Sequence, residues 1–338
     1  MRHILLGILA VAVVSLKLVA AQPFGGGPVV ERFDPALDEI LSVDARLDVI
    51  KQDYFGAAEG PTWVSQTGGG YLAFSDMGAN RIYQWDPVAR QLSVLHAGAG
   101  YTGTDLTRVR ALDNGRLMVA LLGTNGLDVD LDGRLVFCAH GDRALGRMEV
   151  DGTRTILADR FEGKRFNGPN DLVVKSDGSI YFTDLGAPLL GGFTNSPDRE
   201  LDFRGVFRWT SDGAVQLISR DLGNGIAFSP DEAHLYVTGA GVTRFDVLPD
   251  GSVTNGQVHV QRGADGVRVD AHGFLYGGGG RSGVWIASPD GSVLGVIRTP
   301  DMASDSITNI AFGDADGRGL YICTLRSLYH IRLERSAW

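Results

Sequence analysis

Short apolar runs alternate with polar turns along nearly the whole chain. Typical runs are rich in β-branched and aromatic residues, as in Leu172-Val173-Val174, Ile180-Tyr181-Phe182, Leu235-Tyr236-Val237 and Leu320-Tyr321-Ile322. Apolar runs of this kind, bounded by turn residues, predict β-strands. Beyond the first 21 residues no stretch sustains a 3.6-residue apolar period. The pattern therefore predicts an all-β protein with almost no helix.

Asp-Gly pairs mark the turns between these strands. They stand at 132–133, 151–152, 177–178, 212–213, 250–251, 290–291 and 316–317. Asp-Gly between apolar runs predicts a tight hairpin in which both turn residues have positive φ. The turns fall into two alternating sets, one in the first hairpin of each unit and one in the second. Each unit therefore has four antiparallel strands, which is the blade of a β-propeller.

Each unit opens with a polar residue, usually followed by glycine and then by an apolar strand. The six openings are Glu59-Gly60, Asn125-Gly126, Asn170-Asp171, Asn224-Gly225, Asp265-Gly266 and Asn309-Ile310. Their spacing is close to the length of one blade, which predicts a six-bladed β-propeller. The first strand of a blade lines the central channel, so these six side chains should form a ring at one channel mouth. The last unit has three clear strands, and Arg46–Lys51 is expected to supply the fourth and close the ring.

Composition and charge narrow the class of protein. Glycine contributes 47 of 338 residues, which suits many tight turns, and the net charge of −9 argues against a nucleic-acid partner. Residues 1–21 combine Arg2 and His3 with an apolar stretch and small residues near Ala21, which predicts a signal peptide. An uncleaved anchor is the alternative. We expect a leader segment over 22–45, loosely ordered, then the propeller over 46–338, in a periplasmic or secreted protein with no membrane contact after cleavage.

Two cysteines, Cys138 and Cys323, lie in apolar strand-like runs. Export permits a disulfide, but the apolar setting favours two buried free thiols.

Four of the six ring residues form a coherent set of ligands for a hard metal ion. Glu59 and Asp265 supply carboxylates, and Asn170 and Asn224 supply amide oxygens. This set suits Ca²⁺, with Mg²⁺, Mn²⁺ or Zn²⁺ as alternatives, although the absence of His and Cys disfavours zinc. The competing interpretation is that buried Asn and Asp residues before glycine only cap the inner strands. That alternative stays open above all for Asn125 and Asn309.

The ordered motifs resemble the gluconolactonase and senescence-marker-protein family over about residues 55–333. The motifs are Glu59-Gly60-Pro61-Thr62-Trp63, Asn125-Gly126-Leu127, Phe166-Asn167-Gly168-Pro169-Asn170-Asp171, Lys175 to Asp184, Arg199 to Phe203, Asn224-Gly225-Ile226 and Asp265-Gly266-Val267. The resemblance implies a six-bladed propeller with one catalytic divalent metal that opens sugar lactones. Related propellers include paraoxonases and diisopropyl fluorophosphatase, which have a catalytic calcium in a similar set of ligands.

The resemblance also implies roles for single residues. Glu59, Asn224 and Asp265 match metal ligands, and Asn170 matches an asparagine that binds either metal or substrate. Asp265 also matches the residue assigned as general base. One departure concerns specificity: after Asp184 the chain has Leu185-Gly186-Ala187-Pro188, where many bacterial gluconolactonases have Pro-Pro-Tyr-Gly.

Further candidates lie near the expected ring. His140 follows a second strand and is a second catalytic candidate, with an ordinary loop histidine as the alternative. Asn125, Asn170, Asp184 and Asn309 are candidates for substrate contacts. The expected function is that of a metal-dependent lactonase, a carboxylic ester hydrolase acting on a small lactone or ester. The alternatives are another ester or phosphotriester hydrolase on the same ring, or a non-catalytic binding propeller. Motifs of serine hydrolases, zinc proteases and phosphate loops are absent from the sequence.

Overall fold

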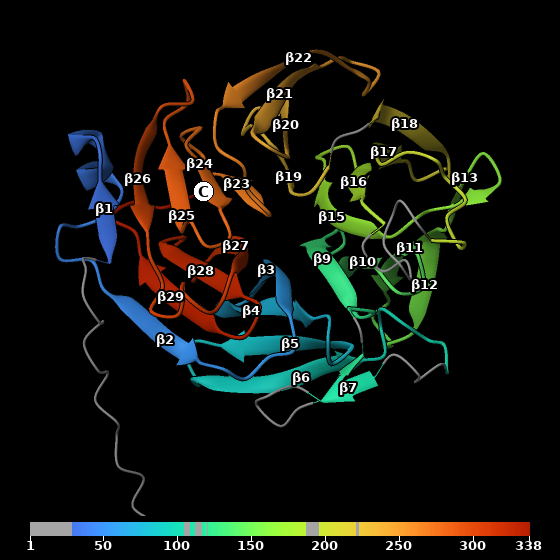
Figure 1. The fold of residues 1–338 in the computed structure, drawn as a ribbon, viewed down its shortest axis with the longest axis horizontal. Coiled ribbons are helices and arrows are strands. Elements are labelled where there is room, and N and C mark those ends of the chain that lie inside the picture. The colour runs from blue at the N-terminus through green and yellow to red at the C-terminus, as the bar shows by residue number, and fades with distance from the viewer. Residues whose placement is uncertain (1–28, 105–108, 112–116, 120, 187–195, 221–222) are drawn as a thin grey trace, which may run out of the picture.

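The apolar runs form six antiparallel sheets arranged around one axis (Figure 1). The computed structural model describes residues 29–104, 109–111, 117–119, 121–186, 196–220 and 223–338, with the backbone alone for 109–111 and 117–119. The first strand of each sheet lies near the axis, and later strands lie progressively nearer the rim (Figure 1). The fold is therefore the six-bladed β-propeller that the repeats predicted.

Each blade has a sheet of four strands, to which blade 5 adds a fifth. Blades 1 to 3 contain β3 (Ala58–Gln66), β4 (Gly69–Asp76), β5 (Arg81–Asp86), β6 (Gln91–Ala97); β9 (Thr124–Val129), β10 (Leu135–Ala139), β11 (Ala144–Met148), β12 (Arg154–Ala158); and β15 (Pro169–Val174), β16 (Ile180–Asp184), β17 (Gly205–Trp209), β18 (Val215–Arg220). Blades 4 and 5 contain β19 (Ile226–Phe228), β20 (His234–Thr238), β21 (Val242–Val247), β22 (Val253–Val260); and β23 (Val267–Val269), β24 (Leu275–Gly278), β25 (Val284–Ala287), β26 (Val293–Ile297), β1 (Val30–Arg32). Blade 6 contains β27 (Ile307–Gly313), β28 (Gly319–Thr324), β29 (Leu328–Arg332), β2 (Leu47–Lys51).

Two short hairpins lie outside the blades. They pair β7 (Val109–Ala111) with β8 (Leu117–Val119), and β13 (Arg160–Phe161) with β14 (Lys164–Arg165).

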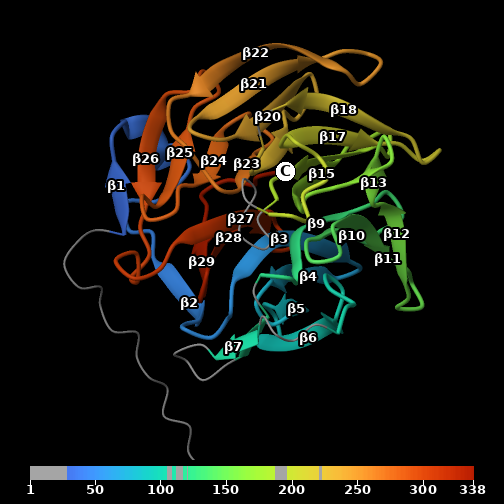
Figure 2. The same ribbon diagram turned by 45° about the vertical axis from the view of Figure 1, so that its right-hand side comes forward.

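The N-terminal segment joins the last two blades (Figure 2). Strand β2 pairs antiparallel with β29, with Leu47 opposite Ile331, and is the rim strand of blade 6. Strand β1 pairs with β26 at the rim of blade 5. Between them a 3₁₀ helix, η1 (Pro35–Glu39), packs Leu37 into the core shared by blades 5 and 6.

This packing differs from the loosely ordered leader expected over residues 22–45. Leu37, Ile40 and Leu41 are fully buried, so residues 30–41 belong to the folded domain. Their apolar side chains cover the rim of the last two blades, and that burial outweighs the effect of the glycine, proline and acidic residues from which a loosely ordered leader was expected. The signal peptide predicted over 1–21 lies outside the described residues and stays a prediction, as does the loop at Ala187-Pro188. Within the described ranges, no helix has the length and apolar character needed to cross a membrane.

The Asp-Gly turns differ in detail from the prediction. Only the glycine of each pair has positive φ, as in Gly152 (φ 80°) and Gly251 (φ 81°). The preceding aspartate accepts a hydrogen bond from the backbone N–H two residues further on, at 2.9 Å for both Asp151 and Asp250. The turn is therefore a type I turn followed by a left-handed glycine. The aspartate stabilises it through its side chain and does not need positive φ itself.

The hydrophobic core lies between adjacent blades. At the junction of blades 1 and 6, Trp63 stacks on Tyr321 with ring centroids 6.1 Å apart. Trp63 therefore packs between blades. Cys138 and Cys323 are both buried and free, as the apolar setting of the two residues favoured. The inter-blade cores hold each inner strand at a fixed place on the channel wall.

We expect Leu37→Ala to lower the free energy of unfolding by about 3 kcal/mol, because it leaves a cavity between blades 5 and 6. Val43→Ala is the matched control, since Val43 is 71% exposed in the same segment and should change stability little. Urea denaturation of both variants measures the effect. Equal stability of Leu37→Ala and the wild-type protein would contradict the burial of this segment.

Candidate active site

The six polar residues that open the blades meet at one mouth of the channel. Glu59, Asn125, Asn170 and Asn309 lie within their inner strands, and Asn224 and Asp265 lie just before theirs. Glu59, Asn125, Asn170 and Asn309 are buried, while Asn224 and Asp265 are partly exposed. The structure therefore brings all six into the ring that the spacing predicted.

Side-chain contacts link neighbouring members of this ring. The Asn125 Nδ2 donates to Asn170 Oδ1 at 2.8 Å, and the Asn170 Nδ2 donates to Asn224 Oδ1 at 2.7 Å. The Asn224 side chain in turn hydrogen-bonds Asp265, and the Asn309 side chain hydrogen-bonds Glu59. A series of hydrogen-bonded asparagine amides therefore leads to Asp265 from one side of the ring, and Asn309 hydrogen-bonds Glu59.

The glycine that follows most ring residues is needed because adjacent inner strands approach closely. A Cβ on Gly225 would lie 2.5 Å from the Asp265 carbonyl oxygen, and one on Gly266 would lie 1.9 Å from Asn309 Oδ1. A Cβ on Gly60, where φ is +48°, would lie 2.2 Å from the Asn125 carbonyl oxygen. Each glycine therefore lets the next ring residue pack against the strand before it.

Hydroxyl groups near the ends of the second strands fix the backbone of the ring. Ser75 donates to the Asn125 carbonyl at 2.7 Å, Thr183 to the Asn224 carbonyl at 2.7 Å, and Thr238 to the Asp265 carbonyl at 2.9 Å. Each hydroxyl comes from the blade preceding the ring residue that it holds. These hydrogen bonds tie the second strands of blades 1, 3 and 4 to the inner strand of the next blade, which limits movement of the ring.

Burial shifts the ionisation of both ring carboxyl groups. It raises the pKa of Asp265 to about 7; the Asn224 hydrogen bond opposes this rise and the charge of Asp171 adds to it. The pKa of Glu59 is raised well above its usual range, first by burial and then by the negative charges of Asp265 and Asp171. Two carboxyl groups that repel each other in a buried site favour either a proton or a cation between them.

The donor atoms of the ring fit a hard divalent cation. They are carboxylate and amide oxygens, and Asn125 Oδ1 is buried without a hydrogen-bond partner within the protein. Among the described residues, no group of three or more His, Cys, Asp or Glu side chains lies close enough together to hold a metal ion. A cation at this mouth would therefore rely on amide oxygens as well as on Glu59 and Asp265.

His140 lies beside the ring, fully buried, directly after β10. Its Nδ1 is 2.8 Å from the Pro169 carbonyl oxygen, one residue before Asn170, so Nδ1 carries the proton. Burial lowers the pKa of His140 to about 4, and its Nε2 has no partner within the protein. The neutral ring thus has one bare nitrogen with which to accept a hydrogen bond.

Asp184 does not join the ring. Its carboxylate accepts hydrogen bonds from the backbone N–H groups of Asn167, at 2.7 Å, and of Gly168. Asp76 has the same role in blade 1, where it accepts from Gly56 and Ala57. Both aspartates therefore hold the loop that leads into a ring residue, Asn170 or Glu59.

Three charged channel residues were not among the predicted site residues. Asp171 is 1% exposed and lies near Glu59 and Asp265, while Arg268 and Asp128 lie further along the channel. A signal for Asp171 was present in the repeat, since four other blades have glycine at the equivalent position. No comparable signal marked Arg268, because the residues three positions after the ring share no common type.

Fold and ring together define a six-bladed propeller with an oxygen-rich site at one channel mouth. The chain belongs to the SMP-30/Gluconolactonase/LRE-like family, whose model matches residues 57–326. A gluconolactonase from Zymomonas mobilis is 31% identical over 325 residues, covering 90% of this chain and 85% of its own.

Solved structures agree with this assignment. A gluconolactonase from Xanthomonas campestris is 30% identical, with a TM-score of 0.75 over 94% of this chain and 99% of its own. A putative gluconolactonase is 28% identical, with a TM-score of 0.73 over 90% of this chain and 97% of its own.

We expect Gly266→Ala to lower the free energy of unfolding by about 3 kcal/mol, because the new Cβ would overlap the buried Asn309 side chain. Gly239→Ala is the control, since the nearest atom to a Cβ there is 3.9 Å away. Urea denaturation of the two variants gives the difference. An equally small effect of both would argue against close packing at the ring.

Without divalent cations, the Asp265 pKa of about 7 should make stability fall as pH rises from about 4 to 7. The folded carboxyl group keeps its proton over this range, whereas the unfolded one has lost it. The lowered His140 pKa acts in the opposite direction, so the wild-type protein must be compared with Asp265→Asn. Denaturation in chelator at pH 5 and pH 7.5 should show a wild-type loss larger by about 2 kcal/mol. Parallel profiles would contradict the raised pKa.

Proposed function

We propose that this protein is a lactone hydrolase that uses a divalent cation, with calcium as the preferred ion. The observation that carries the proposal is the ring itself, in which asparagine amides link a buried Glu59 and a partly exposed Asp265 at one channel mouth. Similarity to the Zymomonas mobilis gluconolactonase over most of both chains supports a lactone substrate. A six-membered sugar lactone is the substrate class that this relative suggests.

The cation would be held by Glu59, Asn170, Asn224 and Asp265. When bound, it supplies a Lewis acid that stabilises negative charge developing on a carbonyl oxygen. The asparagine amides are neutral, so the two carboxylates alone balance the charge of a dication. The all-oxygen donor set favours calcium over cations that prefer nitrogen or sulfur ligands.

The reaction itself needs a base, a nucleophile and a proton for the leaving oxygen. Asp265 takes a proton from water as the water oxygen forms a bond to the lactone carbonyl carbon. The bond between that carbon and the ring oxygen then breaks, and the proton on Asp265 passes to the released alkoxide. The product is a hydroxy acid, and Asp265 returns to its starting state.

His140, beside the ring, and Asn125, within it, would position the substrate. The Nε2 of His140 accepts a hydrogen bond from a substrate hydroxyl or from the attacking water, because its proton stays on Nδ1. Asn125 has a buried amide oxygen to offer to a second substrate hydroxyl. A polyhydroxylated lactone satisfies both groups, whereas a purely aliphatic lactone leaves them unpaired.

Asp265→Ala should reduce kcat/KM for glucono-δ-lactone by about 10³-fold or more, because it removes both the base and a cation ligand. Asp48→Ala is the control: this carboxyl group has a side chain that is 75% exposed and lies in strand β2. A pH-stat assay, corrected for spontaneous hydrolysis, measures both variants. Near-wild-type activity of folded Asp265→Ala would contradict the proposed role of Asp265 as base and cation ligand.

Chelation should abolish lactone hydrolysis by the wild-type protein, and added calcium should restore it. A panel of aldonolactones, aliphatic lactones, aryl esters and organophosphates, assayed with and without chelator, distinguishes the lactonase from other hydrolases. Turnover of none of them would favour a binding propeller, and turnover in chelator would exclude the proposed cation.

A further inference from the structure

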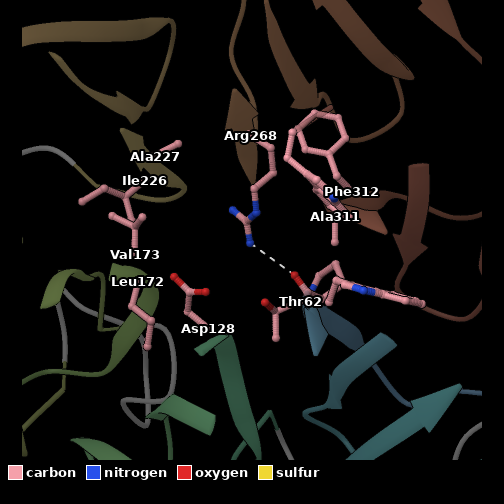
Figure 3. A pocket seen from close by; sticks show the side chains of 12 residues that line it. Thr62, Asp128, Leu172, Val173, Ile226, Ala227, Arg268, Ala311 and Phe312 are labelled. Atoms are coloured by element: carbon pink, nitrogen blue, oxygen red, sulfur yellow. Dashed lines mark hydrogen bonds between the residues drawn. The ribbon is translucent and has the colours of Figure 1, made fainter. Parts of the chain in front are cut away.

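A second layer of side chains lines the channel behind the ring. It consists of the residues three positions after each ring residue, namely Thr62, Asp128, Val173, Ala227, Arg268 and Phe312. They surround a cavity of about 230 Å³ (Figure 3). Among the described residues of this wall, Arg268 is the only basic side chain.

Arg268 is held by contacts to its own inner strand and to the inner strand of blade 1. Its Nη1 donates to the Val267 carbonyl at 2.8 Å. Its Nη2 donates to the Pro61 carbonyl at 3.4 Å (Figure 3). Its Nη1 also lies 3.5 Å from Asp171 Oδ2. The guanidinium therefore has a fixed place between the second layer and the ring.

Asp171 connects this guanidinium to the ring. Its Oδ1 accepts the backbone N–H of Leu172 at 3.0 Å, and its Oδ2 accepts Asn309 Nδ2 at 3.4 Å. Asn309 in turn hydrogen-bonds Glu59. An unbroken chain of polar contacts thus runs from Arg268 through Asp171 and Asn309 to a ring carboxyl group.

Negative charge at this end of the channel exceeds what a divalent cation alone would offset. Glu59 and Asp265 together match a divalent cation, Asp171 adds a third carboxylate close to both, and Asp128 adds a fourth carboxyl group in the second layer. A buried carboxylate without a counter-charge is strongly unfavourable. A carboxylate beside a cation site also increases the electrostatic attraction for the cation. Arg268 supplies one positive charge from inside the protein, which offsets part of this excess.

We propose that Asp171 and Arg268 are positioning residues whose fixed ion pair tunes how tightly the ring binds its cation. This inference rests on the proposed function, because it assumes a cation at the ring. Asp171 strengthens the attraction and Arg268 weakens it, so removing either charge shifts the affinity in a predictable direction. A pair that served only to stabilise the fold would give no such opposite shifts.

A double-mutant cycle on the chelator-stripped full-length protein tests this pair, with calcium affinity read by titration calorimetry. Arg268→Met should bind calcium about tenfold or more tightly than the wild-type protein, because it removes a nearby positive charge. Asp171→Asn should bind it about tenfold or more weakly. The double variant, which loses both charges, should lie within about threefold of the wild-type affinity.

Arg298→Met is the control, since Arg298 also belongs to blade 5 and pairs with Glu31 at 2.7 Å but at the rim. Its calcium affinity should not change. Circular dichroism checks that each variant is folded. If Arg268→Met does not fold, the remaining arms decide: Asp171→Asn must weaken binding, and the added Arg268→Met must restore it.

Two outcomes would overturn the inference in different ways. Calcium binding by the wild-type protein with weaker binding by both single variants would refute the ion pair as a tuning device, and leave the metal site intact. No calcium binding by the wild-type protein would overturn the metal site and this inference together.

Discussion

Six inner strands that converge on one axis impose the constraint on which the site depends. At the channel mouth, neighbouring strands approach so closely that a Cβ on Gly225 or Gly266 would overlap the following ring residue. The same crowding turns the polar side chain before each glycine toward its neighbours in the ring. Close packing of backbone thus creates the ring, and hydroxyls such as those of Thr183 and Thr238 keep it in register. The catalytic potential of the fold is a direct result of how tightly its blades meet.

Electrostatics then decides what such a ring can hold. Burial raises the pKa values of Glu59 and Asp265, and the charge of Asp171 raises both further. Asparagine amides and a neutral His140 surround these groups without adding further negative charge. Arg268 is the fixed cation of the channel wall, and it faces two carboxylates, Asp171 and Asp128. The protein therefore concentrates negative charge at one mouth and offsets part of it from within.

The sequence predicted the architecture and the ring well, because both repeat. Every blade contains its own turn motifs and its own ring residue. A wrong assignment in one blade can therefore be recognised by comparison with the other five. Features that occur once were harder to predict. The burial of Leu37 and Ile40 depends on a rim that forms only after the chain closes on itself. Asp184 binds the backbone N–H groups of a loop and does not join the ring. That role depends on the direction of those N–H groups, which the sequence does not reveal. Arg268 reaches Asp171 across two blades, and no local pattern encodes such a contact.

The pairing of β2 with β29 has a consequence for the order in which the molecule assembles. Blade 6 combines a strand from near the start of the described chain with three from its end. Strand β2 must therefore wait for nearly all of the other strands to be made before its partner exists. Contacts so distant in sequence are slow to form, because a long loop of chain must close before they gain any stability. Folding is thus expected to finish at blade 6, with the closing of the circle as its last and least local step.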